Sequence, residues 1–492
     1  MYYKYFKLLS VLIAVVLTLS VFSSCGDSAD SKIDFQTAGN DDTTAFTAET
    51  TTEDPAKQLN LPELDFGGYT VNMVTVDRYN DHFKLDSEMT GDALDDAGYE
   101  RNLALSELLN IDFNVTEVND PPQTFKKSIM AGDNEYDFIF PHATGGVAAL
   151  VTDHLLYDWN KLEHVDFSKP WWNQSMTNSL GIGNRLYYAS GDIVMAWQGM
   201  NVILFNKDYL EQINLEKDLY DTCFEGEWTI DYQTKIIKDI ATDIDGDGEM
   251  TKADKYGLLE NKNTGYSYVY ASDIRITTPD ENGWPKLSLY NEKMINLVQK
   301  YYDMIWSGDV TLDEYSSVTY ATGSYRDMII EGRCFLSSLD IGSLYPYLRE
   351  IEHDFGILPI PKYDEAQEKY RVFCGAGLIG IPVNAPDTSR TGAIAEAMAY
   401  YSYQYIRPAF FDIVLENKAV RDENSYKVIR LMHENKVFDF GFNFDSTGSA
   451  YNMITEVVIK KKSTDFASYY AKNESKIMKN FQKIIDAVMN ED

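Results

Sequence analysis

Short apolar blocks alternate with polar segments along most of the chain. Residues 71–76, 136–140 and 202–205 have the length and the β-branched and aromatic content of buried strands. Residues 294–305 place apolar side chains on one face of a helix, and Leu105, Leu108 and Leu109 also follow helical spacing. Strands that alternate with helices predict an α/β fold with parallel sheets. The 492 residues exceed what one core usually holds, so two lobes are predicted.

The longest apolar block lies near the N-terminus and has the pattern of a secretion signal. Lys4 and Lys7 precede residues 8–22, an apolar run interrupted by three hydroxyl side chains. The run is shorter than the roughly 20 residues that span a bilayer. A basic start, a short apolar run and small residues after it predict an export signal.

Cys25 closes this N-terminal block. It follows Ser23 and Ser24, and this arrangement resembles the lipobox of bacterial lipoproteins, although Phe22 stands where that motif usually has leucine. The resemblance implies that residues 1–24 are a lipoprotein signal peptide and that Cys25 is acylated and becomes the new N-terminus. The alternative is an ordinary signal peptide whose cleavage site happens to lie near a cysteine.

Residues 25–60 are rich in Thr, Asp, Ser and Ala and contain few large apolar side chains. Such a segment buries too little apolar surface to fold. We predict a disordered tether that begins at the lipidated Cys25 and reaches about 30–35 Å. Together with the export signal, it predicts an extracytoplasmic protein that is lipid-anchored to the cell membrane.

The charge and the cysteine content of the chain limit which partners and cross-links are expected. The chain holds 43 basic and 77 acidic residues, a net charge of −34, which disfavours nucleic acid and anionic lipid surfaces as partners. Aromatic residues make up 13%, as in a well-packed globular protein. Cys223, Cys334 and Cys374 have no CxxC spacing and do not indicate a disulfide framework. We predict a monomer.

Seven short segments with distinctive residues follow one another in a fixed order: 91–102, 136–137, 169–173, 191–192, 204–208, 228–229 and 355–363. Each segment alone is a weak signal. Their order resembles that of the extracellular solute-binding proteins of ABC importers, family 1, which includes many sugar-binding lipoproteins. The resemblance covers nearly all of residues 61–492.

This resemblance implies a periplasmic-binding-protein-like (type II) α/β fold, with two lobes, a hinge and an interlobe cleft. It implies that residues 61–193 and about 373–432 form lobe one, and that residues 194–372 and about 433–492 form lobe two. The chain would cross between lobes near 191–201 and 374–381. The implied function is non-catalytic capture of a small solute, predicted to be a carbohydrate or oligosaccharide, and its delivery to an ABC permease in the membrane.

A sugar site combines aromatic faces for C–H patches with polar side chains for hydroxyl groups. Loops at strand ends and at the lobe crossings are the places to look for them. The predicted ligand-binding residues are Arg78, Tyr79, Asn80, His142, Asp192, Trp197, Gln198, Tyr268, Asp340 and Tyr451. Trp171 and Trp172 rank lower because they follow Pro170 and are expected to pack against a lobe surface.

Residues 243–254 match the calcium loop of EF-hand proteins. Asp243, Asp245 and Asp247 occupy loop positions 1, 3 and 5, and a glycine follows at position 6. Glu249 would supply its backbone carbonyl, and Asp254 stands at position 12, where glutamate is usual. The pattern predicts a structural Ca²⁺ in lobe two, with a solvated acidic turn as the alternative. No other cofactor is predicted.

Enzyme motifs are few. Residues 375–380 fit GxGxxG, but Pro382 and Pro386 follow where a dinucleotide site needs a helix, which favours a close-packed strand at the second crossing. The sequence contains no GxSxG, HExxH or P-loop motif. We therefore predict no enzyme activity. Two alternatives remain: a secreted glycoside hydrolase with paired carboxylates, and a surface adhesion receptor that binds without transport.

Overall fold

The computed structural model describes residues 57–77, 83–213, 215–313, 324–344, 350–375, 377–416 and 423–491. Cys25 and three predicted ligand-binding residues, Arg78, Tyr79 and Asn80, lie outside the described residues. In the part that is described, no helix has both the length and the apolar character needed to cross a bilayer.

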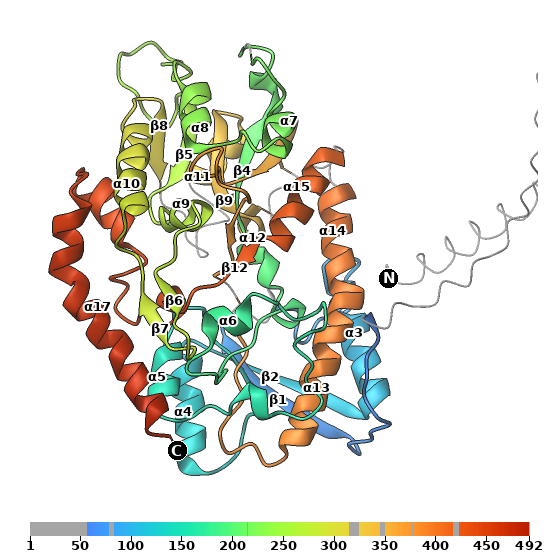
Figure 1. Ribbon diagram of the computed structural model, residues 1–492. Helices are drawn as coiled ribbons and strands as arrows, with labels where there is room; N and C mark the ends of the chain where they lie inside the picture. Colours follow the sequence, from blue (N-terminus) through green and yellow to red (C-terminus); the bar gives the residue numbers. More distant parts are fainter. Residues whose placement is uncertain are drawn as a thin grey trace, which may run out of the picture. The chain divides into compact units, whose positions relative to one another are not determined.

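A small parallel sheet lies in the first part of the chain (Figure 1). Its central strand is β1 (Tyr69–Val76), which pairs with β2 (Ile111–Val118) on one side and β3 (Phe138–Phe140) on the other. Between these strands run α3 (Ala93–Leu109) and α4 (Pro121–Ala131). The Asp92 carboxylate accepts the Leu94 N–H and so caps α3. Leu105 and Leu109 are buried as expected, but Leu108 is 40% exposed because it lies off the packed face of the helix.

A five-stranded sheet forms the second part. Its strand order is β10-β4-β9-β5-β8, with bounds β4 (Asn201–Asn206), β5 (Tyr256–Asn261), β8 (Val310–Asp313), β9 (Cys334–Asp340) and β10 (Phe355–Pro359). β5 pairs in parallel with β8 and β9, whereas β4 pairs antiparallel with β9 and β10. The prediction of parallel sheets is therefore confirmed for the first sheet. In the second sheet it is confirmed for the pairs that include β5 and wrong for the pairs that include β4.

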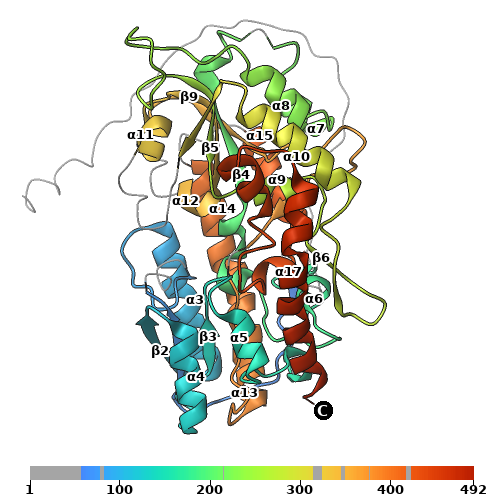
Figure 2. The same cartoon turned by 90° about the vertical axis from the view of Figure 1, so that its left-hand side faces the viewer.

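The remaining helices cover the sheets or connect them (Figures 1 and 2). In α10 (Glu292–Ile305), the predicted face is buried except for Tyr302, which is only partly covered. The other helices are α5 (Val147–Thr152), α6 (Met176–Leu180), α7 (Leu219–Phe224), α8 (Ile230–Ile237), α9 (Tyr266–Ala271), α11 (Ser324–Ile330), α12 (Ile341–Leu344), α13 (Thr388–Tyr401), α14 (Arg407–Glu416), α15 (Glu423–Glu434), α16 (Phe440–Asn443) and α17 (Phe466–Met489).

Two short two-stranded sheets complete the described part. β6 (Thr277–Pro279) pairs with β7 (Pro285–Leu287), and β11 (Val372–Phe373) pairs in parallel with β12 (Lys436–Val437). β11 and β12 come from distant parts of the chain and lie beside the segments predicted to cross between lobes.

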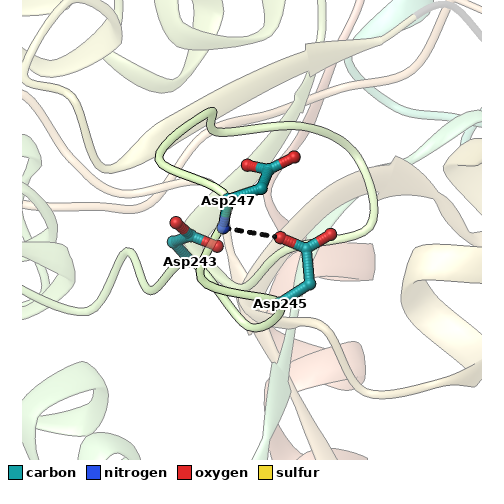
Figure 3. A group of neighbouring side chains, drawn as sticks. All are labelled: Asp243, Asp245 and Asp247. Carbon is teal, nitrogen blue, oxygen red and sulfur yellow. Dashed lines mark hydrogen bonds between the residues drawn. The ribbon is translucent and has the colours of Figure 1, made fainter.

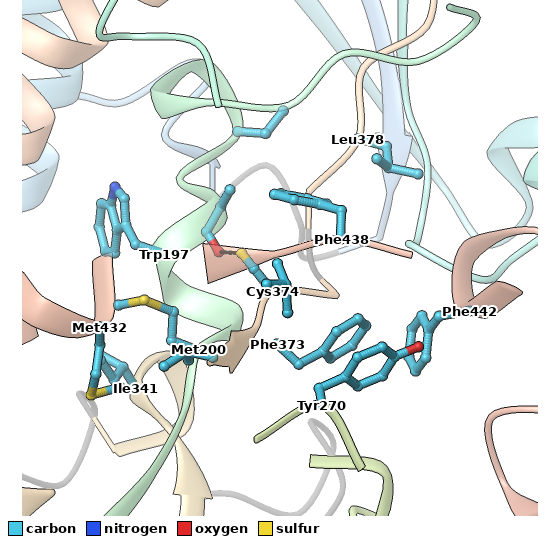
Figure 4. Packing of buried hydrophobic residues seen from close by; sticks show 14 of the residues in the cluster. Trp197, Met200, Tyr270, Ile341, Phe373, Cys374, Leu378, Met432, Phe438 and Phe442 are labelled. Atoms are coloured by element: carbon cyan, nitrogen blue, oxygen red, sulfur yellow. Dashed lines mark hydrogen bonds between the residues drawn. The ribbon is translucent and has the colours of Figure 1, made fainter. Parts of the chain in front are cut away.

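The two predicted crossing segments lie side by side. Bridges pair Met200 with Cys374 and Ala189 with Ile379, and Figure 4 shows Met200 and Cys374 packed near Phe373 and Phe438. Gly377 has φ +68°, and a Cβ at this position would lie 2.6 Å from the Val194 carbonyl oxygen. The glycines of residues 375–380 thus serve close backbone packing.

Candidate functional site

The loop after β3 presents His142. The Gly145 N–H donates to the His142 carbonyl and closes a tight turn, and the imidazole is exposed. Desolvation by the surrounding protein nevertheless lowers the pKa of this imidazole.

Helix α16 reaches this loop from the other end of the chain. The Asn443 side-chain amide donates a 3.0 Å hydrogen bond to the Ala143 carbonyl. Phe442, one residue earlier, contacts Tyr451, with ring centroids 4.7 Å apart. The His142 loop therefore lies next to an aromatic cluster.

We call this cluster the aromatic platform; it consists of Tyr266, Phe373, Phe442 and Tyr451. The ring of Tyr266 packs edge-on against Phe442 at 5.1 Å and against Phe373 at 5.4 Å. Phe373 and Phe442 are buried and lie next to each other in Figure 4, whereas Tyr266 and Tyr451 are partly exposed. The two buried rings support two tyrosines that face outward.

Polar groups flank the platform. Burial is the main cause that raises the pKa of the Tyr266 phenol. The charge of Asp340 and the hydroxyl of Tyr451 raise it further, so both groups lie close to the Tyr266 ring. Asp340 ends β9, and Gln198 lies close to it, because both residues contact Gly342. A Cβ built on Gly342 would lie 3.4 Å from Asp340 Oδ1 and 3.2 Å from Gln198 Cβ. We define the candidate site as His142, Gln198, Tyr266, Asp340 and Tyr451.

Three predicted ligand-binding residues lie elsewhere. The Tyr268 side chain is fully buried, and its hydroxyl lies 3.1 Å from Gln233 Oε1 and 3.4 Å from Glu260 Oε2. Trp197 is buried against Phe410, with ring centroids 3.7 Å apart. Asp192 is buried and forms an ion pair with Arg407. The structure thus places none of the three together with the other predicted ligand-binding residues: Tyr268 and Trp197 lie in the core, and Asp192 lines a separate cavity.

Tyr266 was missed by sequence reasoning, which selected Tyr268 on the same helix. Successive helical residues point about 100° apart, since 3.6 residues make one turn, so residues two apart face nearly opposite sides. Tyr268 is fully buried in the core, whereas Tyr266 lies on another face of the helix, packs against the core and remains partly exposed. The signal was present: β5 ends at Asn261, and Tyr266 begins the helix that follows the next loop.

Glu260 of β5 is fully buried next to Tyr268, and burial raises the pKa of its carboxyl from 4.5 to about 8. The folded state thus keeps a proton that the unfolded chain loses at lower pH. The stability that this group contributes is complete below pH 4.5 and is lost as the pH rises through about 8.

We expect Glu260→Gln to remove this loss. The thermal midpoint of the variant, relative to wild type, should rise steadily between pH 5 and pH 8, as followed by calorimetry in matched buffers. A second buried carboxyl also titrates in this range, since burial raises the pKa of Glu396 to about 7. Because both proteins contain Glu396, it changes both midpoint curves equally. Parallel midpoint curves for the two proteins would contradict the expectation.

The predicted calcium loop brings its first three carboxylates together (Figure 3). Asp243, Asp245 and Asp247 each place an oxygen within 4.8 Å of the others. The Asp243 carboxylate accepts the N–H groups of Gly246 and Gly248, at 2.7 and 2.8 Å. These exposed oxygens suit a hard cation such as Ca²⁺.

Asp254 ties the two ends of this loop together. Its oxygens accept the Thr251 N–H at 2.7 Å and the Ile244 N–H at 2.9 Å, and these bonds lower the pKa of the carboxyl. The predicted twelfth ligand therefore already has a structural role. The Glu249 N–H donates to Asp247 Oδ1, so Glu249 lies on the same turn as the three carboxylates.

No family model and no curated protein matches this chain. Solved structures do resemble it. An ABC-transporter solute-binding protein from Thermotoga lettingae, bound with α-D-tagatose, is 13% identical with a TM-score of 0.51, over 84% of this chain and 100% of that one. The maltose/maltodextrin-binding domain MalE from Bdellovibrio bacteriovorus, bound to maltotriose, is 12% identical with a TM-score of 0.52, over 86% and 100%.

UgpB from Mycobacterium tuberculosis, in complex with glycerophosphocholine, is 13% identical with a TM-score of 0.53, over 86% of this chain and 100% of that one. Likeness at such identities concerns the fold. The chain has the periplasmic-binding-protein-like α/β fold of ABC-transporter solute-binding proteins, and the fold class predicted from the sequence is confirmed.

Proposed function

We propose that this protein is a non-catalytic solute-binding protein that captures a carbohydrate or oligosaccharide at the candidate site. The observation that carries the proposal is the aromatic platform, whose tyrosines Tyr266 and Tyr451 are partly exposed, with Asp340 close to Tyr266. Aromatic faces take the C–H patches of a sugar, while carboxylate, amide and imidazole groups bind its hydroxyls. Two of the three structural neighbours named above were solved with sugars bound.

The proposed working cycle includes hinge closure, capture and delivery to an ABC permease. The crossing segments that pair at Met200 and Cys374 connect the parts of the chain that contain the two larger sheets, and rotation about such a short connection closes a cleft on its ligand. The predicted signal peptide and the lipid on Cys25 would hold the protein outside the cytoplasm, at the membrane that contains the permease.

A thermal-shift screen with oligosaccharides and peptides tests the proposed solute class. A ligand that binds only the folded state stabilises it by about 2.7 kcal/mol at one hundred times its Kd. We expect at least one oligosaccharide to raise the midpoint and the peptides to leave it unchanged. A shift by peptides alone would contradict the carbohydrate assignment.

The glycoside hydrolase alternative makes a different prediction. Glycosidases use two carboxyl groups around the scissile bond, whereas the candidate site as defined holds one, Asp340. Chromatography of each oligosaccharide after overnight incubation with the protein distinguishes the alternatives. Intact sugar together with binding supports the proposal, and cleavage that disappears in Asp340→Asn would contradict it.

We further propose that the 243–254 loop binds a structural Ca²⁺. Calcium is expected to raise the thermal midpoint by a few degrees and chelation to reverse the rise, because the ion binds the folded loop. Asp245→Asn removes one exposed carboxylate and should abolish the calcium response. The control is Asp280→Asn, in an exposed turn elsewhere. A midpoint that does not respond to calcium or chelator at matched ionic strength would contradict the site.

A further inference from the structure

A cavity of about 270 Å³ shares no residue with the candidate site. It is lined by residues 170–175, Gly191, Asp192, Arg407, His433, Glu434 and Lys436. Gly191 and Asp192 begin the crossing segment whose far end carries Gln198 of the candidate site.

The walls of this cavity are attached to different sheets. On one wall, the indole N–H groups of Trp171 and Trp172 donate to Glu396 of α13, at 3.0 and 2.7 Å, and α13 packs on α3 beside the three-stranded sheet. On the other wall, His433 and Glu434 belong to α15, which packs on β10 of the five-stranded sheet. A molecule bound here would touch both walls.

The cavity wall includes hydrogen-bond donors that have no partner among the described residues. Arg407 uses Nε and Nη2 on Asp192, and Nη2 also donates to the Pro170 carbonyl at 3.0 Å. Arg407 Nη1, Lys436 Nζ and Asn173 Nδ2 form no hydrogen bond with the part of the chain that the structure describes. Asn173 Oδ1 already accepts from Ser175. Three donor groups, two of them cationic, therefore line one cavity.

The charges favour a single negative group in the cavity. Asp192 is neutralised by Arg407, and the Glu434 carboxylate is exposed at the rim, where water screens it. The Lys436 ammonium remains without an ion pair among the described residues, and burial lowers its pKa to about 8. One unpaired ammonium balances one negative charge, so a monoanion fits the cavity better than a dianion such as phosphate.

We propose that this cavity is a second binding site, for the carboxylate of a small organic acid held by Lys436, Arg407 Nη1 and Asn173 Nδ2. Ionised acceptors form the strongest hydrogen bonds with such donors. The volume lies just below the roughly 300–1,000 Å³ of usual ligand pockets, which limits the ligand to a small acid. Pro170 lines the same cavity and would pack against the apolar part of the acid.

Titration calorimetry with acetate, lactate and benzoate tests this site, with sodium chloride at equal ionic strength as the reference. We expect at least one carboxylate to bind at one site per chain. Lys436→Met should weaken that binding at least tenfold, and Asn173→Ala should weaken it without any change of charge. Lys427→Met is the matched control, since Lys427 is exposed on α15 and pairs with Glu423.

Circular dichroism establishes that each variant is folded before titration. The proposal is overturned if no carboxylate binds more strongly than chloride, or if folded Lys436→Met and Asn173→Ala bind it as wild type does. Tyr266→Ala should bind the carboxylate normally. The assay contains no carbohydrate, so failure of the carbohydrate proposal and failure of this one are separate results.

Discussion

Replacing Tyr266 with alanine is expected to abolish carbohydrate binding at usual assay concentrations. Tyr266 is the outward ring that stands between Asp340, Tyr451 and the buried Phe442. Loss of a central aromatic contact typically costs about 2–4 kcal/mol of binding free energy, which raises Kd by about 30- to 1,000-fold. Titration calorimetry with the oligosaccharide found in the screen measures the change directly.

A matched tyrosine separates this effect from general loss of an aromatic ring. Tyr290 is exposed and stacks on Tyr470 of α17, at 4.7 Å between centroids, outside the candidate site. Tyr290→Ala should bind the sugar as wild type does. If Tyr266→Ala binds the oligosaccharide as tightly as wild type does, the aromatic platform is not the sugar-binding surface.

Replacing Asp439 with alanine is expected to cause the largest loss of stability, about 4–5 kcal/mol. The carboxylate is buried and accepts from the Gly441 N–H at 2.7 Å, the Thr277 hydroxyl at 2.7 Å, the Ile276 N–H at 2.6 Å and the Tyr270 hydroxyl at 3.2 Å. Alanine leaves these buried donors without an acceptor, at about 1–3 kcal/mol for each lost partner. Urea denaturation measures the difference in unfolding free energy.

Asp280 provides the control for Asp439. It also accepts two backbone N–H groups, from Asn282 and Trp284, but it lies in an exposed turn. Water replaces the lost acceptor there, so Asp280→Ala should cost about 1 kcal/mol or less. Similar losses for the two variants would show that the buried Asp439 cluster does not hold α16 and β6 together.

Two residues of the candidate site could be proposed from the sequence because they lie at strand ends. His142 follows β3 and Asp340 ends β9, and these positions depend on where a strand stops, which the local apolar pattern shows. Gln198 and Tyr451 also join the site. The orientation of α9 could not be predicted in the same way. Tyr266 and Tyr268 lie on different faces of this helix, and only the packing of the helix decides which of the two is buried.

Asp192 and Trp197 show the limit of local reasoning. Both lie in the predicted crossing segment, yet their partners come from α14: Arg407 for Asp192, at a separation of 215 residues, and Phe410 for Trp197. Nothing near either residue in the sequence indicates those contacts. The antiparallel pairing of β4 with β9 and β10 was missed for the same reason, since it depends on segments far apart in the chain.

The most direct test of the proposed function is titration calorimetry of the purified protein with a panel of oligosaccharides, combined with chromatography of the sugar recovered afterwards. The account predicts saturable binding of at least one oligosaccharide at one site per chain, lost in Tyr266→Ala, with the sugar recovered intact. Absence of binding across the panel, or recovery of cleaved sugar, would contradict it.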